Sequence, residues 1–159
     1  HWYEYIATGT TWEIAYTNAL ASSYLGLGGY LATVTSAAEN TFITDFVTAD
    51  TARLGGTDEW KASDESDEGT WKWASGPEAG LVFTFSSWAG GEPNNCCGGE
   101  DRLVTNWGAY AWNDIGSPAF PDYAVGYVVE YSSNPAPEPL SLALFGAGLA
   151  GLRLTRRRA

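Results

Sequence analysis

Five side chains with carboxylate or amide groups recur at short spacing in the second half of the chain. Glu92 and Asn94 lie two residues apart, Glu100 follows six residues later, and Asn113 and Asp114 are adjacent. Carboxylate and amide oxygens in this number suit calcium, which takes about six to eight oxygen ligands. Zinc and copper prefer the sulfur or imidazole ligands that this pattern lacks. The spacing therefore predicts a calcium site formed by these five residues.

Pro93 separates the first two of these residues. An X-Pro peptide bond adopts the cis form at modest cost. A cis bond at this position would turn the side chains of Glu92 and Asn94 toward one point.

This arrangement resembles the calcium and sugar site of C-type lectin domains. The resemblance covers most of residues 2–132, and further segments follow in the order of that family: 11–15 (TWEIA), 29–34 (GYLATV), 54–58 (LGGTD), 68–73 (EGTWKW) and 126–130 (GYVVE). It implies an α+β fold in which two helices flank small antiparallel sheets and a long loop carries the calcium. The chain, at 159 residues, is long enough for one such core and not for two.

The resemblance also implies how a sugar would bind. Two adjacent hydroxyls would displace water from the calcium, with Asn94 and Asn113 as hydrogen-bond donors and Glu92 and Glu100 as acceptors. In the family, Glu-Pro-Asn goes with equatorial diols of the mannose, glucose, N-acetylglucosamine and fucose kind, whereas Gln-Pro-Asp goes with galactose. The expected ligand is a glycan or an exopolysaccharide.

Two aromatic residues near these ligands allow two interpretations. Trp107 or Tyr110 could pack on the face of the sugar, but a place in the core is favoured for both.

A second calcium site is a further expectation from the resemblance. Family members with two sites place ligands at the positions of Asp58, Glu68, Asn95, Glu100 and Asp101. The alternative is a solvated acidic loop.

The chain departs from the family in its cysteines. Arg102 and Val129 stand where C-type lectins usually carry disulfide-bonded cysteines, and the only two cysteines are Cys96 and Cys97. This adjacent pair could form a vicinal disulfide, two free thiols or a link to another chain, and a vicinal disulfide or a structural turn is favoured. The core or the metal must then supply the stability that the usual disulfides provide.

Periodicity and capping signals predict the elements that must position these residues. Spacing typical of a capping box favours helices from about residue 12 to 22 and from Ser36 onward, the second with Phe42, Ile43, Phe46 and Val47 on one face. Strands are expected at 2–7, 30–34, 54–57, 71–73, 102–106, 110–112 and 125–131. Residues 74–101 are rich in Gly and Pro and predict a long functional loop.

The charge of the chain argues against nucleic acid as a partner. Residues 1–134 contain 18 acidic residues and 4 basic ones. Such a surface repels phosphate backbones.

The last 27 residues differ in character from the rest. Residues 133–139 read as a linker that ends in Pro137-Glu138-Pro139, and residues 140–159 combine a short apolar run with an Arg-rich end. The apolar run is shorter than the roughly 20 residues that span a bilayer.

This order resembles the PEP-CTERM sorting tail of bacterial exported proteins. The resemblance implies transient retention at the inner membrane, cleavage by an exosortase, and a secreted or cell-surface product. The alternative is a short membrane or amphipathic helix that is not processed.

Residues 1–132 allow two other classes of function. The same fold could act as an adhesion or protein-interaction module in which calcium orders the loop. A hydrolase could use Glu92 and Glu100 as paired carboxylates, but these residues are better explained as ligands, and no nucleophile elbow, phosphate loop or zinc motif is present. The expectation is therefore a binding protein and not an enzyme.

Overall fold

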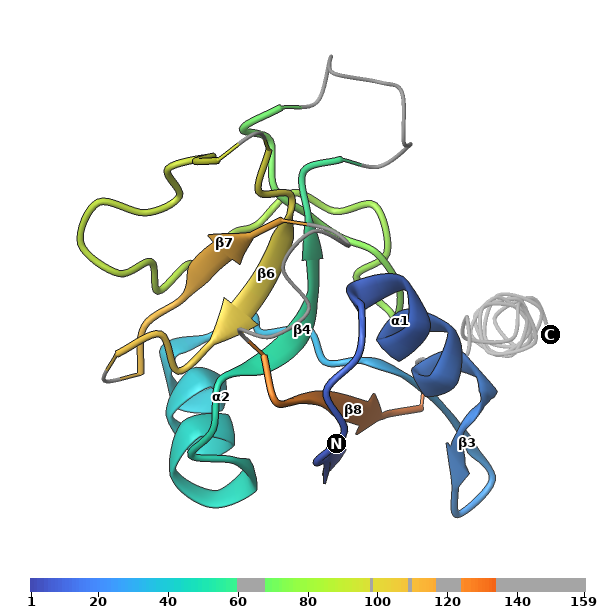
Figure 1. The fold of residues 1–159 in the computed structure, drawn as a ribbon. Coiled ribbons are helices and arrows are strands. Elements are labelled where there is room, and N and C mark those ends of the chain that lie inside the picture. Colours follow the sequence, from blue (N-terminus) through green and yellow to red (C-terminus); the bar gives the residue numbers. More distant parts are fainter. Residues whose placement is uncertain (60–67, 98, 109, 117–123, 134–159) are drawn as a thin grey trace, which may run out of the picture.

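The strands form one twisted sheet with two helices packed on it (Figure 1). The computed structural model describes residues 1–59, 68–97, 99–108, 110–116 and 124–133. The elements are β1 (Trp2–Ile6), α1 (Trp12–Ala21), β2 (Ser23–Tyr24), β3 (Leu27–Leu31), α2 (Ala37–Phe42), the π-helical turn η1 (Ile43–Val47), β4 (Ala52–Thr57), β5 (Lys72–Trp73), β6 (Arg102–Thr105), β7 (Asn113–Ile115) and β8 (Gly126–Tyr131). The expected α+β class is confirmed.

The sheet order places the two ends of the domain side by side. Strands run in the order β2-β3-β8-β4-β6-β7, with β1 on β8 and β5 on β4. All these pairs are antiparallel except β4 with β8, which is parallel. The pairing of β1 with β8 joins the first strand to the last one described, so the fold closes on itself. Strand β7 lies at the edge of the sheet.

An aromatic core lies beneath the long loop that follows β5. Trp112 is fully buried, and its indole N–H donates to Asn40 Oδ1 over 2.7 Å. Trp73 stacks on Phe83 of the loop at 4.1 Å, and Trp71 meets Trp88 edge-on at 4.8 Å. Burial of large rings from the loop against Trp112 compensates for the absence of regular structure there. The buried Trp112 therefore fixes the position of the residues that directly follow it.

Both helices begin with the polar caps that the sequence predicts. Thr11 caps α1 and Ser36 caps α2, each accepting the backbone N–H three residues later. Among the described residues, no helix combines the length and the apolar character that a membrane crossing needs.

The expected apolar face of the second helix is wrong in part. Ile43 is buried, but Phe42 and Phe46 are 46% and 77% exposed. The backbone N–H of Thr48 bonds to Ile43 O, a spacing of five residues that marks a π-helical turn. This wider turn breaks the 3.6-residue period on which the expected face depended.

The strand expected at 110–112 lies instead at Asn113–Ile115. Asn106 and Tyr110 have positive φ angles of 58° and 62°, and the N–H of Trp107 bonds to Ala111 O. The chain therefore turns across these residues. The apolar run that suggested a strand is a turn followed by the buried Trp112, which pairs with Trp88 in an isolated bridge.

Arg102, which stands where the resemblance to C-type lectins leads one to expect a cysteine, makes a buried polar junction. Its guanidinium donates to Glu13 Oε1, Glu59 Oε2 and Thr57 Oγ1 over 3.2, 3.1 and 2.8 Å, and it lies 5.1 Å from the ring of Trp12. These contacts connect β6 to α1 and to β4 and the residues after it. One planar cation with several donors can hold segments that a disulfide would otherwise link in pairs.

Replacement of Arg102 by Met is expected to destabilise the fold by about 2 kcal/mol, because Glu13 and Glu59 would lose their buried partner. The estimate is below the usual cost of a broken buried pair because both glutamates are partly exposed. Chemical denaturation of the full chain without calcium measures the change. Arg102→Lys is the matched control. It keeps the positive charge but lacks the planar guanidinium with its several donors, so an intermediate loss of stability is expected. A Met variant as stable as the native chain would contradict this role.

The expected sorting signal at Pro137–Glu138–Pro139 and the segment 140–159 lie outside the described residues, as does all of the linker except Ser133.

Candidate functional site

The long loop is tied to β7 by a single buried carboxylate. Asp114 is 1% exposed, and its two oxygens accept the backbone N–H groups of Asn94 and Asn95 over 3.2 and 2.7 Å. The Glu92–Pro93 bond just before these residues is cis. Because β7 follows the rigid Trp112, these hydrogen bonds place the loop residues against the edge of the sheet.

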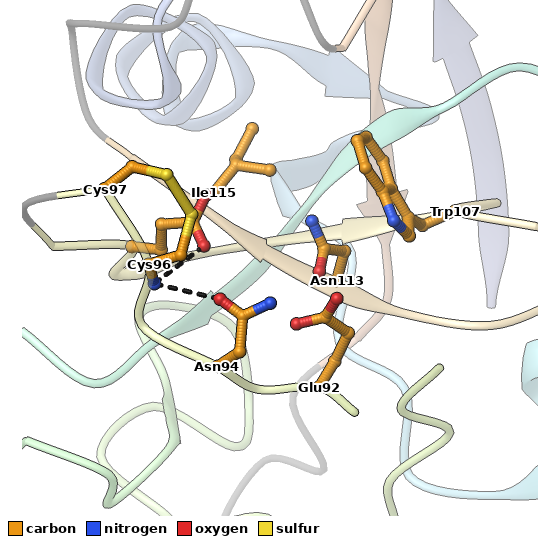
Figure 2. Close-up of a pocket in the computed structure, with 8 residues that line it drawn as sticks. Glu92, Asn94, Cys96, Cys97, Trp107, Asn113 and Ile115 are labelled. Atoms are coloured by element: carbon orange, nitrogen blue, oxygen red, sulfur yellow. Dashed lines mark hydrogen bonds between the residues drawn. A yellow bond between two sulfur atoms is a disulfide. The ribbon is translucent and has the colours of Figure 1, made fainter. Parts of the chain in front are cut away.

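A pocket of about 210 Å³ opens where the loop meets β7 (Figure 2). It brings together four of the five residues expected to hold calcium, and Asp114 lies behind them as the anchor of the loop. The residues that line the pocket are Glu92, Asn94, Cys96, Cys97, Glu100, Trp107, Asn113 and Ile115.

Two oxygen atoms of the pocket have no hydrogen-bond partner among the described residues. They are Oε2 of Glu92 and Oδ1 of Asn113, and both are buried. Buried polar atoms are normally paired, so such oxygens point to a missing partner. In Figure 2 the two side chains face each other.

The electrostatics of the pocket also favour a cation. Desolvation raises the pKa of Glu92, and the Asp114 and Glu100 carboxylates raise it further. Desolvation likewise raises the pKa of Glu100, with Asp114 and Asp101 adding to the effect. Carboxylates that repel one another in this way release that repulsion when a cation binds among them. The donor set of hard oxygens fits calcium.

A backbone turn holds two of these side chains in place. The N–H of Cys96 donates to Asn94 Oδ1 over 2.9 Å and to Glu100 Oε2 over 3.1 Å. Asn95 and Cys97 on either side have positive φ angles. Cys96 and Cys97 form a disulfide, which confirms the favoured interpretation of this pair.

A second acidic cluster lies beside the pocket. Carboxylate oxygens of Asp58, Glu68 and Asp101 lie within 4.8 Å of one another. Asp58 is buried, and its Oδ1 has no hydrogen-bond partner among the described residues, while Oδ2 accepts the N–H of Gly69. Desolvation raises the pKa of Asp58 to about 6.

Asn95 connects the second cluster to the pocket. Its side-chain amide donates to Glu68 Oε1 over 2.7 Å, and its Oδ1 accepts the N–H of Glu100 over 2.8 Å. Of the five residues expected at the second site, three therefore form the cluster, Asn95 contacts one of them, and Glu100 faces the pocket.

The favoured core placement of Trp107 and Tyr110 is wrong. They are 36% and 52% exposed, because the chain turns at Asn106 and at Tyr110, which carries both away from the core. Trp107 lines the pocket, whereas Tyr110 does not.

Three residues of the pocket were not expected there: Cys96, Cys97 and Ile115. The two cysteines directly follow the loop ligands in sequence, and Ile115 directly follows Asp114. Their positions next to predicted ligands in the sequence are the signal that could have indicated a place in the pocket.

Comparison with known proteins finds lectins among the relatives of the chain. It is 32% identical over 133 residues to ladderlectin from Oncorhynchus mykiss, a match that covers 82% of the chain and 64% of ladderlectin. It is 35% identical over 142 residues to halomucin from Haloquadratum walsbyi, which covers 82% of the chain but 1% of halomucin. The chain thus spans less than two thirds of either relative. No protein-family profile matches it.

Comparison with solved structures identifies the class of fold. The C-type lectin CEL-I from Cucumaria echinata superposes with a TM-score of 0.61 at 27% identity, over 82% of this chain and 89% of CEL-I. A calcium-independent type II antifreeze protein has the same fold, with a TM-score of 0.61 at 21% identity over 82% of this chain and 86% of that protein. The chain has a C-type lectin fold. Lectin relatives support the expectation of a binding protein and not an enzyme.

Proposed function

We propose that this protein binds carbohydrate through calcium held in the pocket between the long loop and β7. The observation that carries the proposal is the pair of unpartnered buried oxygens, Glu92 Oε2 and Asn113 Oδ1, in a pocket that also contains Asn94 and Glu100. The lectin relatives support the same function.

Glu92, Asn94, Glu100 and Asn113 would hold the calcium, and Asp114 would hold the loop that carries the first three of them. When bound, calcium offers coordination positions that sugar hydroxyls can take from water. The amides of Asn94 and Asn113 can donate to these hydroxyls, and the carboxylates of Glu92 and Glu100 accept from them. Each hydroxyl would then be paired on both sides, which offsets the cost of its removal from water.

The placement of donors and acceptors sets the expected sugar. Glu92 supplies an acceptor and Asn94 a donor, the order that the resemblance to C-type lectins associates with mannose, glucose, N-acetylglucosamine and fucose. The pocket volume of about 210 Å³ is below the roughly 300 Å³ at which typical small-molecule sites begin. A pocket of this size suits one terminal sugar residue, and useful avidity toward a polysaccharide would need several copies of the domain.

Trp107 would cover one side of the bound sugar. The indole lies at the side of the pocket in Figure 2, beyond Asn113. An aromatic face suits the C–H surface of a pyranose ring, which the polar ligands leave uncovered.

We further propose that Asp58, Glu68 and Asp101 hold a second calcium ion. The Oδ1 of buried Asp58 has no hydrogen-bond partner in the described part of the chain, which supports this, because a solvated acidic loop would not bury a carboxylate oxygen without a partner. Asn95 would connect the two calcium sites through its hydrogen bonds to Glu68 and Glu100.

We also propose export through the tail. The order of Pro137-Glu138-Pro139, an apolar run and clustered arginines supports processing by an exosortase after transient inner-membrane retention in a bacterium, which would leave the lectin domain secreted or on the cell surface. The intact mass of protein recovered outside the cells tests this: a product cut near residues 137–139 is expected, and one that retains the arginines would oppose it.

The sugar proposal predicts chelator-sensitive binding. Calorimetric titration of methyl α-mannoside into the full chain is expected to show weak binding with calcium present and none with excess chelator. Glu92→Gln combined with Asn94→Asp keeps one carboxylate and one amide but exchanges donor and acceptor, so this control is expected to prefer a galactoside.

Two results would contradict the sugar mechanism. Calcium binding without any response to sugar would favour the adhesion or protein-interaction module. Unchanged mannoside preference in the exchanged variant would show that Glu92 and Asn94 do not select the sugar.

The second site predicts a pH-dependent calcium titration. Because the pKa of Asp58 is raised from 3.8 to about 6, protons compete with calcium as the pH falls through 6. Calcium affinity at this site is therefore expected to be about tenfold lower at pH 5 than at pH 7. Asp58→Asn is expected to reduce the calcium bound from two ions per chain to one. Two ions bound by that variant would exclude the cluster.

A further inference from the structure

The pocket has two apolar sides of different chemistry. Figure 2 shows the Cys96–Cys97 disulfide on one side and Trp107 on the other, with Glu92, Asn94 and Asn113 between them. Both cysteines line the pocket, and Cys97 is exposed to solvent.

A disulfide between adjacent residues adds little to the stability of the fold. The stabilisation that a disulfide gives through the unfolded chain grows with the length of loop that it closes. Cys96 and Cys97 are one residue apart, so the loop is the smallest possible. A role for this disulfide is therefore sought in the pocket that both cysteines line.

The sulfur atoms are also not needed to hold the neighbouring ligands. The contacts to Asn94 and Glu100 come from the backbone N–H of Cys96, which any residue except proline provides. Asp114 anchors the same stretch through the backbone of Asn94 and Asn95. The side chains of the cysteines are therefore free to serve the ligand.

We propose that the Cys96–Cys97 disulfide is a wall of the sugar site that packs on the C–H face of the bound sugar residue. This inference rests on the proposed function of the pocket. Sulfur is polarisable and gives favourable contact to apolar surface, and the covalent link removes the rotamer freedom that flexible side chains lose on binding. The polar ligands fix the hydroxyls, while the disulfide selects sugars that present an apolar ring face on its side of the pocket.

The composition of the chain allows a direct test on the native protein. Cys96 and Cys97 are the only cysteines, so selective labelling of cysteine places NMR reporters in this wall alone. With calcium and saturating methyl α-mannoside, intermolecular Overhauser effects are expected between the cysteine β-protons and the ring protons of the sugar. Their absence in the saturated complex would overturn the proposal.

A double variant, Cys96→Ala with Cys97→Ala, gives a second test. Its calcium affinity is expected to stay within about threefold of the native value, while mannoside affinity falls about fivefold through lost apolar contact. Trp2→Ala removes an exposed aromatic side chain that does not line the pocket and serves as the control, with both affinities unchanged.

The outcomes separate this proposal from the proposed function. Native protein that binds no mannoside would overturn both. Native binding with unchanged mannoside affinity in the double variant would overturn the disulfide wall alone. A parallel loss of calcium and mannoside affinity in that variant would show that the disulfide braces the calcium ligands, which also overturns the wall.

Discussion

The hydrogen bonds from Asn94 and Asn95 to the Asp114 carboxylate are the contacts on which the site depends. They join a loop without regular secondary structure to the short edge strand β7. The positions of the loop and of the strand are each fixed by contacts with other parts of the fold. On the strand side, Trp112 is buried and bonded to Asn40 just before β7. On the loop side, aromatic rings pack into the core. Pocket geometry is thus determined by packing on both sides and by one carboxylate between them.

Repulsion between carboxylates is the second constraint. Glu92, Glu100 and Asp114 share the pocket region, and Asp58, Glu68 and Asp101 form a cluster beside it, with pKa values raised at four of these six positions. Such an arrangement is unfavourable in the protein alone and favourable around a cation. The side-chain amide of Asn95 bonds to one residue of each group and so links the two clusters.

The sequence predicted the polar part of the site better than its apolar part. Glu92, Asn94, Glu100 and Asn113 share a motif whose spacing carries the chemistry, and the pocket contains all four. For Trp107 and Tyr110 the sequence allows a place on the sugar face or in the core and favours the core, whereas the structure exposes both. Their exposure follows from positive φ angles at Asn106 and Tyr110, which hydropathy does not reveal. The exposure of Phe46 has a similar origin, since one π-helical turn displaces it from the expected face. The sequence alone could not show that Cys96 and Cys97 line the pocket, because this depends on how the loop folds in three dimensions.

Buried polar junctions connect the strands of the sheet to neighbouring segments, and this affects how the site is stabilised. Arg102 links β6 to α1 and β4, while buried Glu130 accepts hydrogen bonds from Tyr30 and from the backbone of Thr33. These junctions lie in the sheet, whereas the one covalent cross-link in the described part of the long loop joins adjacent cysteines. Stability of the loop therefore depends on aromatic packing, on Asp114 and on whatever binds its acidic residues. A cation bound there would stabilise the folded loop by mass action, which couples order in the pocket to its occupancy.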